Sequence, residues 1–208
     1  MGSTGIHAPA ADAAGAPRTR EDVVLAAGRL FAQRGYHGTS MRDLGEELGM
    51  LGSSIYSHVA GKNELLVEVI RRGAEFFNEV VATASAAGGS AIDELERLIR
   101  GHVRVVVGHI DEVRTFLFES RFLPEYDRLK IVEMRDDYEA AYRSAIERGL
   151  GEGSIAAGVD PGITAIFVLS VLNALIRWYR PDGGRDADDI AAEMWAFVAN
   201  GIGAEGSR

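Results

Sequence analysis

Helical periodicity is the feature of this sequence that most limits the folds available to it. In the first clear segment, residues 21–34, apolar side chains recur at helical spacing on one face: Val23, Val24, Ala27, Leu30 and Phe31. No stretch shows sustained alternation of apolar and polar residues between turn signals, which is the pattern of a half-buried strand. The sequence therefore predicts an all-α fold.

Turn-forming stretches divide this pattern into separate helices. Gly35 follows the first helix as a stop. Thr39 or Ser40 can cap the second helix, and Ser40 with Asp43 has the spacing of a capping box. Further breaks have the sequences AAGGS, GLGEGSIAAGVDP and RPDGGRD. The predicted helices cover residues 21–34, 39 or 40 to 48, 53–59, 62–87, 91–110, 112–119, 125–148, 161–179 and 187–200.

Charge and composition limit the class of protein. The 208 residues carry a net charge of −9 and include no cysteine, which excludes disulfides and cysteine zinc sites and fits a reducing compartment. Residues 18–72 hold eight basic and seven acidic side chains, whereas residues 73–208 hold fourteen and twenty-three. Bulk charge argues against a protein that coats nucleic acid, and any anionic partner is expected to meet the N-terminal segment.

The two regions that bear on targeting both favour a cytoplasmic protein. Residues 1–17 are rich in Ala, Gly and Pro and lack the basic start and apolar centre of a secretory signal, so a disordered tail is predicted. The longest uncharged run, residues 163–176, is too short to span a bilayer. No membrane partner is therefore expected.

Residues 39–62 carry the most specific pattern in the chain. Two short predicted helices are joined by a three-residue turn that begins with Gly49, which is a helix-turn-helix signature. The second helix of such a unit enters the DNA major groove, and the next helix begins at Lys62, where the backbone dipole also favours an anion. The candidate DNA-binding residues are Thr39, Ser40, Arg42, Gly52, Ser53, Ser54, Tyr56, Ser57, His58 and Lys62. The alternative is that Tyr56 and His58 are ordinary surface residues of a structural helix pair.

This segment resembles the N-terminal module of the TetR family of transcriptional repressors. The resemblance covers about residues 23–69 and rests on LAAGRLFAQRGYHGTS, Thr39-Ser40, Leu44, Gly49, Ser54-Ile55-Tyr56, His58, Lys62 and Leu65-Leu66. It implies a helix-turn-helix domain, residues 18–65, that reads a palindromic double-stranded operator as a dimer. It also implies a larger helical domain, residues 66–208, that dimerises and binds a small molecule whose binding releases DNA.

The segment departs from the family's pattern at three places. Leu51 stands where the family usually has a capping serine, and the loss of such a cap costs about 1 kcal/mol. Gly52 and Ser53 invert the usual order, which leaves a frequent base-reading position without a side chain. Val59 replaces the usual phenylalanine.

The late helix, residues 161–179, is apolar on almost every side and so is expected to be buried on more than one side. The resemblance implies that the last two helices pair with those of a second copy, because a palindromic operator is read by two copies. The candidate dimer-interface residues are Ile166, Phe167, Ser170, Ala174, Met194, Phe197 and Val198. The alternative is the core of a monomer.

Apolar and aromatic residues with a few polar groups, typical of a small-molecule site, lie between these two regions. His102 and His109 are seven residues apart and share a helical face. The candidate ligand-binding residues are His102, Val106, His109, Phe116, Phe118, Phe122, Tyr138, Tyr142, Asn173, Arg177 and Trp178. The alternative for each is core packing or a solvated face, and no spacing supplies further ligands for a metal at the two histidines.

The stretch NALIRWYRPDGG, residues 173–184, suggests a class of inducer. It resembles the late helix of TetR-like regulators of lipid and sterol breakdown, whose inducers are often acyl-coenzyme A thioesters. Arg177, Arg180 and Arg185 can clamp phosphates in forked geometry. Alternatively, these arginines pair with Asp182, Asp186, Asp188 or Asp189 and the inducer is a drug-like hydrophobic molecule.

Signatures of catalysis are absent from the sequence. There is no Gly-x-Ser-x-Gly elbow, phosphate loop or His-Glu-x-x-His motif, and the glycines at 149, 151 and 153 do not follow a strand. The sequence thus predicts a non-enzymatic, ligand-responsive repressor that needs no cofactor. A helical protein-interaction module without operator binding is the alternative.

Overall fold

The computed structural model describes residues 19–204, so the predicted tail, residues 1–17, lies outside the described residues. The described part is helical and forms no strand, only an isolated bridge between Ile155 and Gly203, which confirms the all-α class. Its elements are α1 Arg20–Arg34, α2 Met41–Leu48, α3 Gly52–Ile55, α4 Lys62–Ala86, α5 Ala91–Gly108, α6 Ile110–Glu119, η1 Ser120–Phe122, α7 Glu125–Glu152, α8 Pro161–Asn173, α9 Leu175–Trp178 and α10 Ala187–Ile202.

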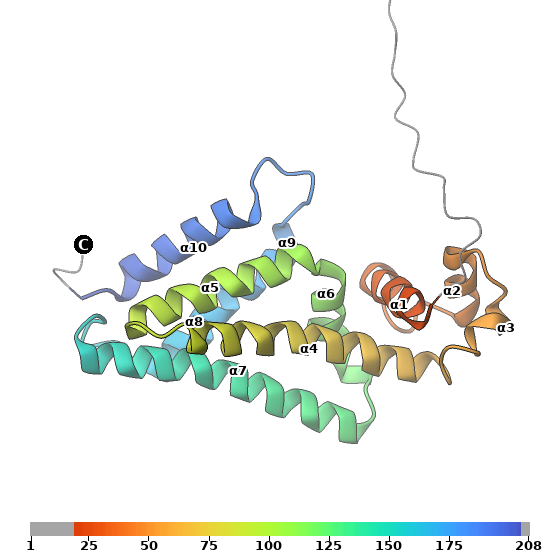
Figure 1. Ribbon diagram of the computed structural model, residues 1–208, viewed down its shortest axis with the longest axis horizontal. Coiled ribbons are helices and arrows are strands. Elements are labelled where there is room, and N and C mark those ends of the chain that lie inside the picture. Colours follow the sequence, from red (N-terminus) through yellow and green to blue (C-terminus); the bar gives the residue numbers. More distant parts are fainter. Residues whose placement is uncertain (1–18, 205–208) are drawn as a thin grey trace, which may run out of the picture.

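The molecule is elongated, with a small N-terminal unit at one end of a larger helical body (Figure 1). Helices α1 to α3 form the unit, and α4 runs from it along the body beside α5 and α7. The connection between unit and body is made by α1, which packs against both α4 and α6. In the body, α10 packs on α5 and α8 packs on α7. One continuous apolar core joins the unit and the body.

The second helix of the DNA-binding motif is shorter than predicted. Instead of residues 53–59, α3 covers only Gly52–Ile55, and residues 56–58 form a turn. No side chain caps its N-terminus, where Leu51 is the N-cap, so the first turn lacks the stabilisation that a capping serine supplies. The predicted absence of a cap is therefore confirmed, and the helix ends after one turn.

Two later boundaries also differ from the prediction. Helix α7 continues through Gly149 to Glu152 and ends at Gly153, which has a left-handed φ of 74°. A Cβ on Gly149 would lie 2.6 Å from the Ile155 Cδ1 atom, so this glycine permits the chain to pack back on the helix. The single helix predicted for residues 161–179 is divided at Ala174 into α8 and α9.

Candidate functional sites

The helix-turn-helix is built by local hydrogen bonds that the sequence specifies. Ser40 Oγ accepts the Asp43 N–H at 3.1 Å, and the Asp43 carboxylate accepts the Ser40 N–H at 2.6 Å, which confirms the capping box. These bonds from Ser40 lower the pKa of the Asp43 carboxyl. Gly49 ends α2 in the left-handed conformation, with a φ of 66°.

A second glycine of the motif, Gly45, is required by the close approach of α2 and α3. A Cβ at this position would lie 2.8 Å from the carbonyl oxygen of Met50 and 2.9 Å from the Gly52 nitrogen. Neither atom belongs to a flexible side chain, so the two helices can meet at this distance only without a side chain. Sequence reasoning did not single out Gly45, although a glycine inside a helix is a signal of close backbone approach.

Nine of the ten candidate DNA-binding residues are exposed or partly buried. Ser40, Ser53, Tyr56 and Ser57 are exposed, Arg42 is exposed and paired with Glu46, and Gly52, Ser54, His58 and Lys62 are partly buried. The Ser57 Oγ donates to the Ser54 carbonyl at 2.7 Å, which fixes the turn after α3. The Lys62 ammonium lies 4.2 Å from the centroid of the Tyr36 ring, and burial lowers its pKa.

Thr39 is the exception among these candidates. Its side chain is 2% exposed, and its hydroxyl donates to the carbonyls of Leu30 and Gly35 at 3.3 and 3.0 Å. The hydroxyl therefore joins the end of α1 to the start of α2 and is not available to DNA. The Thr39 side chain is structural because it caps the last turn of the preceding helix.

Tyr36 lies where the N-terminal unit meets the body. Its backbone N–H donates to the Glu119 carboxylate at 2.8 Å, and its ring stacks on Phe122 at 5.9 Å. Its hydroxyl donates to the Asn63 side chain at the start of α4. Sequence reasoning placed Phe122 in the ligand site, but the structure places it in this junction.

A cavity of about 230 Å³ lies in the body among α4, α5, α6, α7 and α8. Four of the predicted ligand-binding residues line it: His102, Phe116, Tyr138 and Asn173. The other lining residues are Ala74, Phe77, Asn78, Leu117, Met134, Arg135, Glu139, Ile166, Leu169 and Ser170. The wall is thus mainly apolar with a few polar groups, as small-molecule sites usually are.

Aromatic rings pack around Phe77 in the wall of this cavity. The Phe77 ring centroid lies 4.9 Å from that of His102, 5.2 Å from Tyr138 and 5.9 Å from Phe116. His102 is 1% exposed, and burial lowers the pKa of its imidazole to about 3. The ring is therefore neutral in the physiological range.

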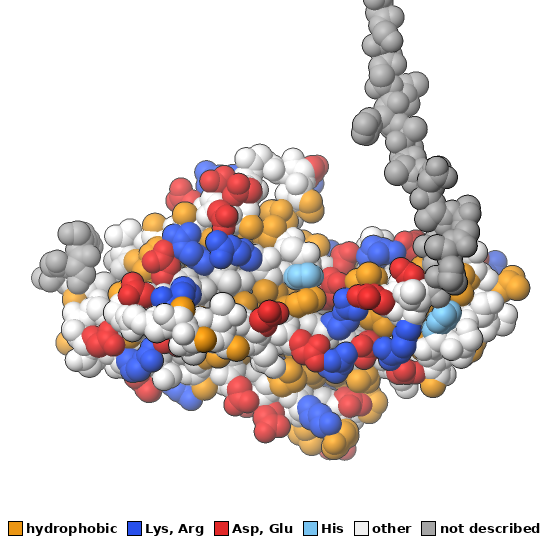
Figure 2. Space-filling model, viewed as in Figure 1, with side chains coloured by type: hydrophobic (Ala, Val, Ile, Leu, Met, Phe, Trp, Pro, Cys, Tyr) orange, Lys and Arg blue, Asp and Glu red, His pale blue; other side chains and the backbone are white. Residues whose placement is uncertain are grey.

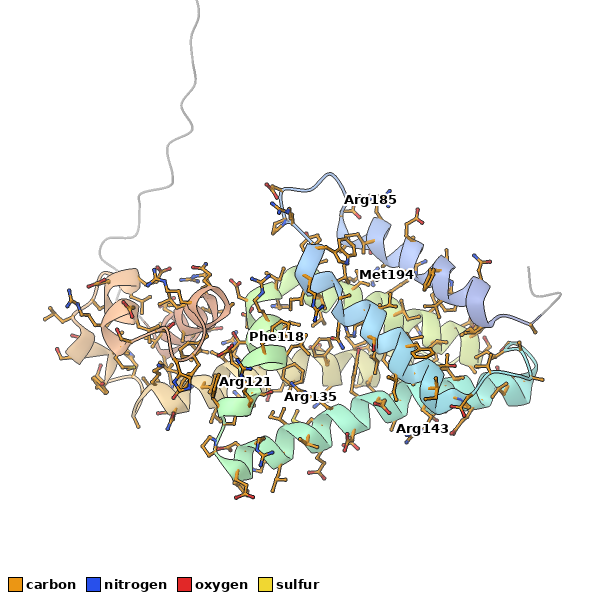
Figure 3. The ribbon with its side chains drawn as sticks, turned by 180° about the vertical axis from the view of Figure 1, so that it is seen from behind. Phe118, Arg121, Arg135, Arg143, Arg185 and Met194 are labelled. Atoms are coloured by element: carbon orange, nitrogen blue, oxygen red, sulfur yellow. The ribbon has the colours of Figure 1, made fainter. Side chains whose placement is uncertain are left out.

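Arg135 is, with Glu139, one of two charged residues of the cavity that sequence reasoning missed. Its guanidinium donates to the Phe116 carbonyl at 2.7 Å and to the Ser120 hydroxyl at 3.1 Å, and lies 4.6 Å from the Phe116 ring. Figure 3 shows Arg135 on α7, beside the lower end of α6. Burial lowers its pKa. It lies three residues before Tyr138 on one helical face, which was the available signal.

The remaining predicted ligand-binding residues lie outside this cavity. Val106 and Tyr142 are fully buried in the core, and Phe118, Arg177 and Trp178 are exposed. His109 stacks on Phe76 at 3.7 Å and lines a separate groove between α4 and α5. His102 and His109 therefore do not share a site, because the helix ends at Gly108 and the chain turns at His109.

The candidate dimer residues divide into three groups. Phe167 and Phe197 are 64% and 68% exposed, and Met194 lines a groove between α8 and α10. Ile166 and Ser170 line the ligand cavity instead, although both remain exposed at its edge, and Ala174 is half-buried. Val198 is 6% exposed within the single chain, because it faces the core beneath α10, so it is not available to a second copy.

The outward face of α8 and α9 is apolar. The segment Pro161–Trp178 has a mean hydropathy of 1.5 and is long and apolar enough, by length and composition, to cross a membrane, and 28% of it is buried. The apolar segment, residues 161–178, is therefore longer than the uncharged run, residues 163–176, which was predicted to be too short to span a bilayer. Burial on more than one side, predicted for this helix, does not occur within one chain.

Known protein families match both parts of this architecture. A family model for the tetracyclin repressor-like C-terminal domain matches residues 88–202, and one for bacterial regulatory proteins of the tetR family matches residues 23–69. The HTH-type transcriptional repressor KstR2 of Rhodococcus jostii (strain RHA1) is 25% identical over 198 residues, 93% of this chain and 96% of that protein. KstR2 of Mycobacterium tuberculosis (strain H37Rv) is 24% identical over 90% of this chain and 94% of its own length.

Solved structures agree with these matches. The structure of the ketosteroid transcriptional regulator KstR2 of Mycobacterium tuberculosis has a TM-score of 0.86 at 23% identity, and covers 89% of this chain and 95% of its own. The structure of AibR in complex with isovaleryl coenzyme A and operator DNA has a TM-score of 0.76 at 26% identity, and covers 86% of this chain and 96% of its own. The family models together span both the helix-turn-helix and the helical body. The chain belongs to the TetR family of helix-turn-helix, DNA-binding transcriptional regulators.

Proposed function

We propose that this chain is a ligand-responsive repressor that binds a palindromic operator as a homodimer and leaves it when an apolar small molecule enters the body cavity. The observation that carries the proposal is that one helix, α6, both lines the cavity and holds the DNA-binding unit. Phe116 and Leu117 face the cavity, while Glu119, at the end of the same helix, accepts the Tyr36 N–H.

A shift of α6 would reach the DNA-binding surface through short contacts. The Thr115 hydroxyl donates to the Gly28 carbonyl of α1 at 3.4 Å, in addition to the bond between Glu119 and Tyr36. Tyr36 in turn contacts both Asn63 and Lys62 at the start of α4. A ligand that displaces Arg135 from the Phe116 carbonyl would therefore bias the position of the unit that carries α3.

The proposed inducer is a hydrophobic acyl-coenzyme A thioester. The apolar cavity suits an acyl group, and the similarity to AibR, whose structure was solved in complex with isovaleryl coenzyme A and operator DNA, supports this class. Within residues 19–204 no ion pair joins Arg177, Arg180 or Arg185 to the nearby aspartates, and Asp188 pairs with Arg104. The three guanidiniums thus have no acidic partner in that range, so they are free to bind the phosphates of a nucleotide. They lie outside the cavity that would hold the acyl group.

The proposed dimer forms through the exposed face of α8 and α10. Exposed apolar side chains of α8, α9 and α10 lie there, namely Ile163, Phe167, Val171, Trp178 and Phe197. A contact with a second copy would bury them, so we propose that α8 meets protein rather than lipid and that the repressor is cytoplasmic and not an enzyme. We propose that residues 18–65 form the DNA-binding domain and residues 66–208 the ligand-binding and dimerisation domain, with the boundary inside α4.

Fluorescence anisotropy with a labelled palindromic fragment from the chain's own promoter tests this function. Isovaleryl-coenzyme A and longer thioesters should release the DNA, whereas coenzyme A alone and the free acids should do less. A Glu119→Ala variant should still bind ligand and DNA but respond less, because the contact between α6 and Tyr36 is removed. Glu125→Ala, an exposed residue at the start of α7, is the control. If no thioester, whatever the length of its acyl group, releases DNA from the parent protein, the proposed class of inducer is wrong. If Glu119→Ala responds to the thioesters as the parent does, the proposed route through α6 and Tyr36 is wrong.

A further inference from the structure

A chain of three hydrogen-bonding side chains ends at the ligand cavity. The Tyr142 hydroxyl lies 3.0 Å from the Leu98 carbonyl oxygen, and 3.2 Å from the Tyr138 hydroxyl. The Tyr138 hydroxyl lies 3.2 Å from the His102 Nδ1 atom. The other ring nitrogen, His102 Nε2, is buried and has no hydrogen-bond partner.

The carbonyl at the start of this chain fixes the direction of every proton. A carbonyl only accepts, so Tyr142 must donate its proton to Leu98. Tyr142 then has none left for Tyr138, so Tyr138 donates to Tyr142, and the third contact needs the proton of His102 Nδ1. No other arrangement places one proton in each of the three contacts. The neutral imidazole therefore carries its proton on Nδ1 and presents a bare lone pair at Nε2.

A second unpartnered atom at the cavity has the opposite polarity. Arg135 Nε is buried without a partner, while the other end of the guanidinium holds the Phe116 carbonyl and Ser120. An arginine Nε–H only donates. Among the residues that line the cavity, His102 on α5 thus has an unpartnered acceptor and Arg135 on α7 an unpartnered donor, beside the polar side chains of Asn78, Glu139, Ser170 and Asn173.

We propose that the cavity selects an apolar ligand that carries a hydroxyl group, which donates to His102 Nε2, and a carbonyl oxygen, which accepts from Arg135 Nε–H. The inference rests on the proposed function and deepens it: in a thioester inducer, the thioester carbonyl meets Arg135 and the acyl group bears the hydroxyl. A buried acceptor that is left unpaired is costly, so a ligand without the donor is rejected.

Matched probes on one saturated two-ring skeleton test the hydroxyl. Calorimetric titration of the full-length protein with decalol and with the methyl ether of decalol should show decalol binding about tenfold more tightly, the effect of one buried hydrogen bond. Equal affinities would overturn the inference while leaving the proposed function intact. If decalol fails to bind but acyl thioesters still release operator DNA, the hydroxyl rule is again wrong and the repressor assignment stands. If no thioester binds or releases DNA, the proposed function itself fails.

A variant of the hydrogen-bond chain separates this role from simple packing. Tyr138→Phe removes the acceptor that holds the proton on His102 Nδ1, so the ring can present N–H at Nε2 and the preference for decalol over its methyl ether should be lost. Tyr126→Phe removes an exposed hydroxyl from the same helix and should leave the preference unchanged. Nitrogen-15 NMR of the ligand-free protein should show the Nδ1–H form of one neutral histidine that is lost in His102→Phe. An Nε2–H pattern for that ring would overturn the assignment.

Discussion

Acidification is expected to destabilise this protein through His102. Burial lowers the pKa of its imidazole to about 3, whereas an unfolded histidine titrates near pH 6.5. Between these values the unfolded chain binds a proton that the folded chain does not, so the free energy of unfolding falls as the pH falls. The loss begins near the unfolded pKa and continues towards the folded one.

The size of this loss follows from the same two values. Each unit of difference is worth about 1.4 kcal/mol, so lowering the pH from 7 to 5 removes about 2 kcal/mol of unfolding free energy through His102 alone. The cavity places two further charged residues near the ring, Arg135 and Glu139, which have opposite signs. The carboxyl groups of Asp43, Glu64 and Glu68 have lowered pKa values, so they titrate below this window.

Urea unfolding at fixed protein concentration measures the effect. The loss of stability between pH 7 and pH 5 should be about 2 kcal/mol smaller in His102→Phe than in the parent, and the control His109→Phe should behave as the parent does. A His102→Asn variant, which keeps a donor for Tyr138, serves if the phenylalanine does not fold. The same pH dependence in the parent and in both His102 variants would refute the argument, because another group would then carry it.

Three further predictions concern DNA binding and assembly. Replacement of Lys62 by Ala should weaken binding to every DNA sequence, as loss of a phosphate contact does. The slope of the logarithm of the binding constant against the logarithm of the salt concentration should fall in magnitude by about one. A slope equal to that of the parent would show that Lys62 makes no such contact. Gly45→Val should abolish operator binding in a gel-shift assay, because it places a side chain against the Met50 and Gly52 backbone. Gly61→Val is the control. An added Cβ at Gly61 has no atom within 4 Å, so this variant should retain the fold. Phe197→Arg should convert a dimer to monomers in light scattering, because an unpaired buried charge costs about 3–5 kcal/mol. Leu129→Arg, which changes an exposed residue of α7, should stay dimeric, and a Phe197→Arg dimer would place the interface elsewhere. Figure 2 shows hydrophobic atoms at the surface where α7 begins.

Local hydrogen-bonding patterns explain why so much of the fold was predictable. The capping box at Ser40 and the left-handed glycine at Gly49 are specified within a few residues, so the helix-turn-helix and most helix boundaries follow from the sequence. The length of α3 was overestimated because its apolar spacing continues to Val59, whereas the helix covers one turn, with no side-chain cap at Leu51 and with the Ser57 hydroxyl donating to the Ser54 carbonyl after it. The sequence contained both signals, but their relative strength did not follow from periodicity.

The ligand site depended on information that no single segment carries. His102 and Tyr138 were predicted because aromatic and histidine residues are typical of pockets, but Phe77 and Arg135 were not, since α4 and α7 each present several faces and only packing decides which one lines the cavity. The same holds for Ile166 and Val198, which helical spacing placed at a dimer face. Sequence alone thus determined the helices, their caps and the DNA-binding motif, because these are short-range. Only the tertiary structure decided which polar atoms are buried without partners, because burial is a property of helices that are distant in the chain.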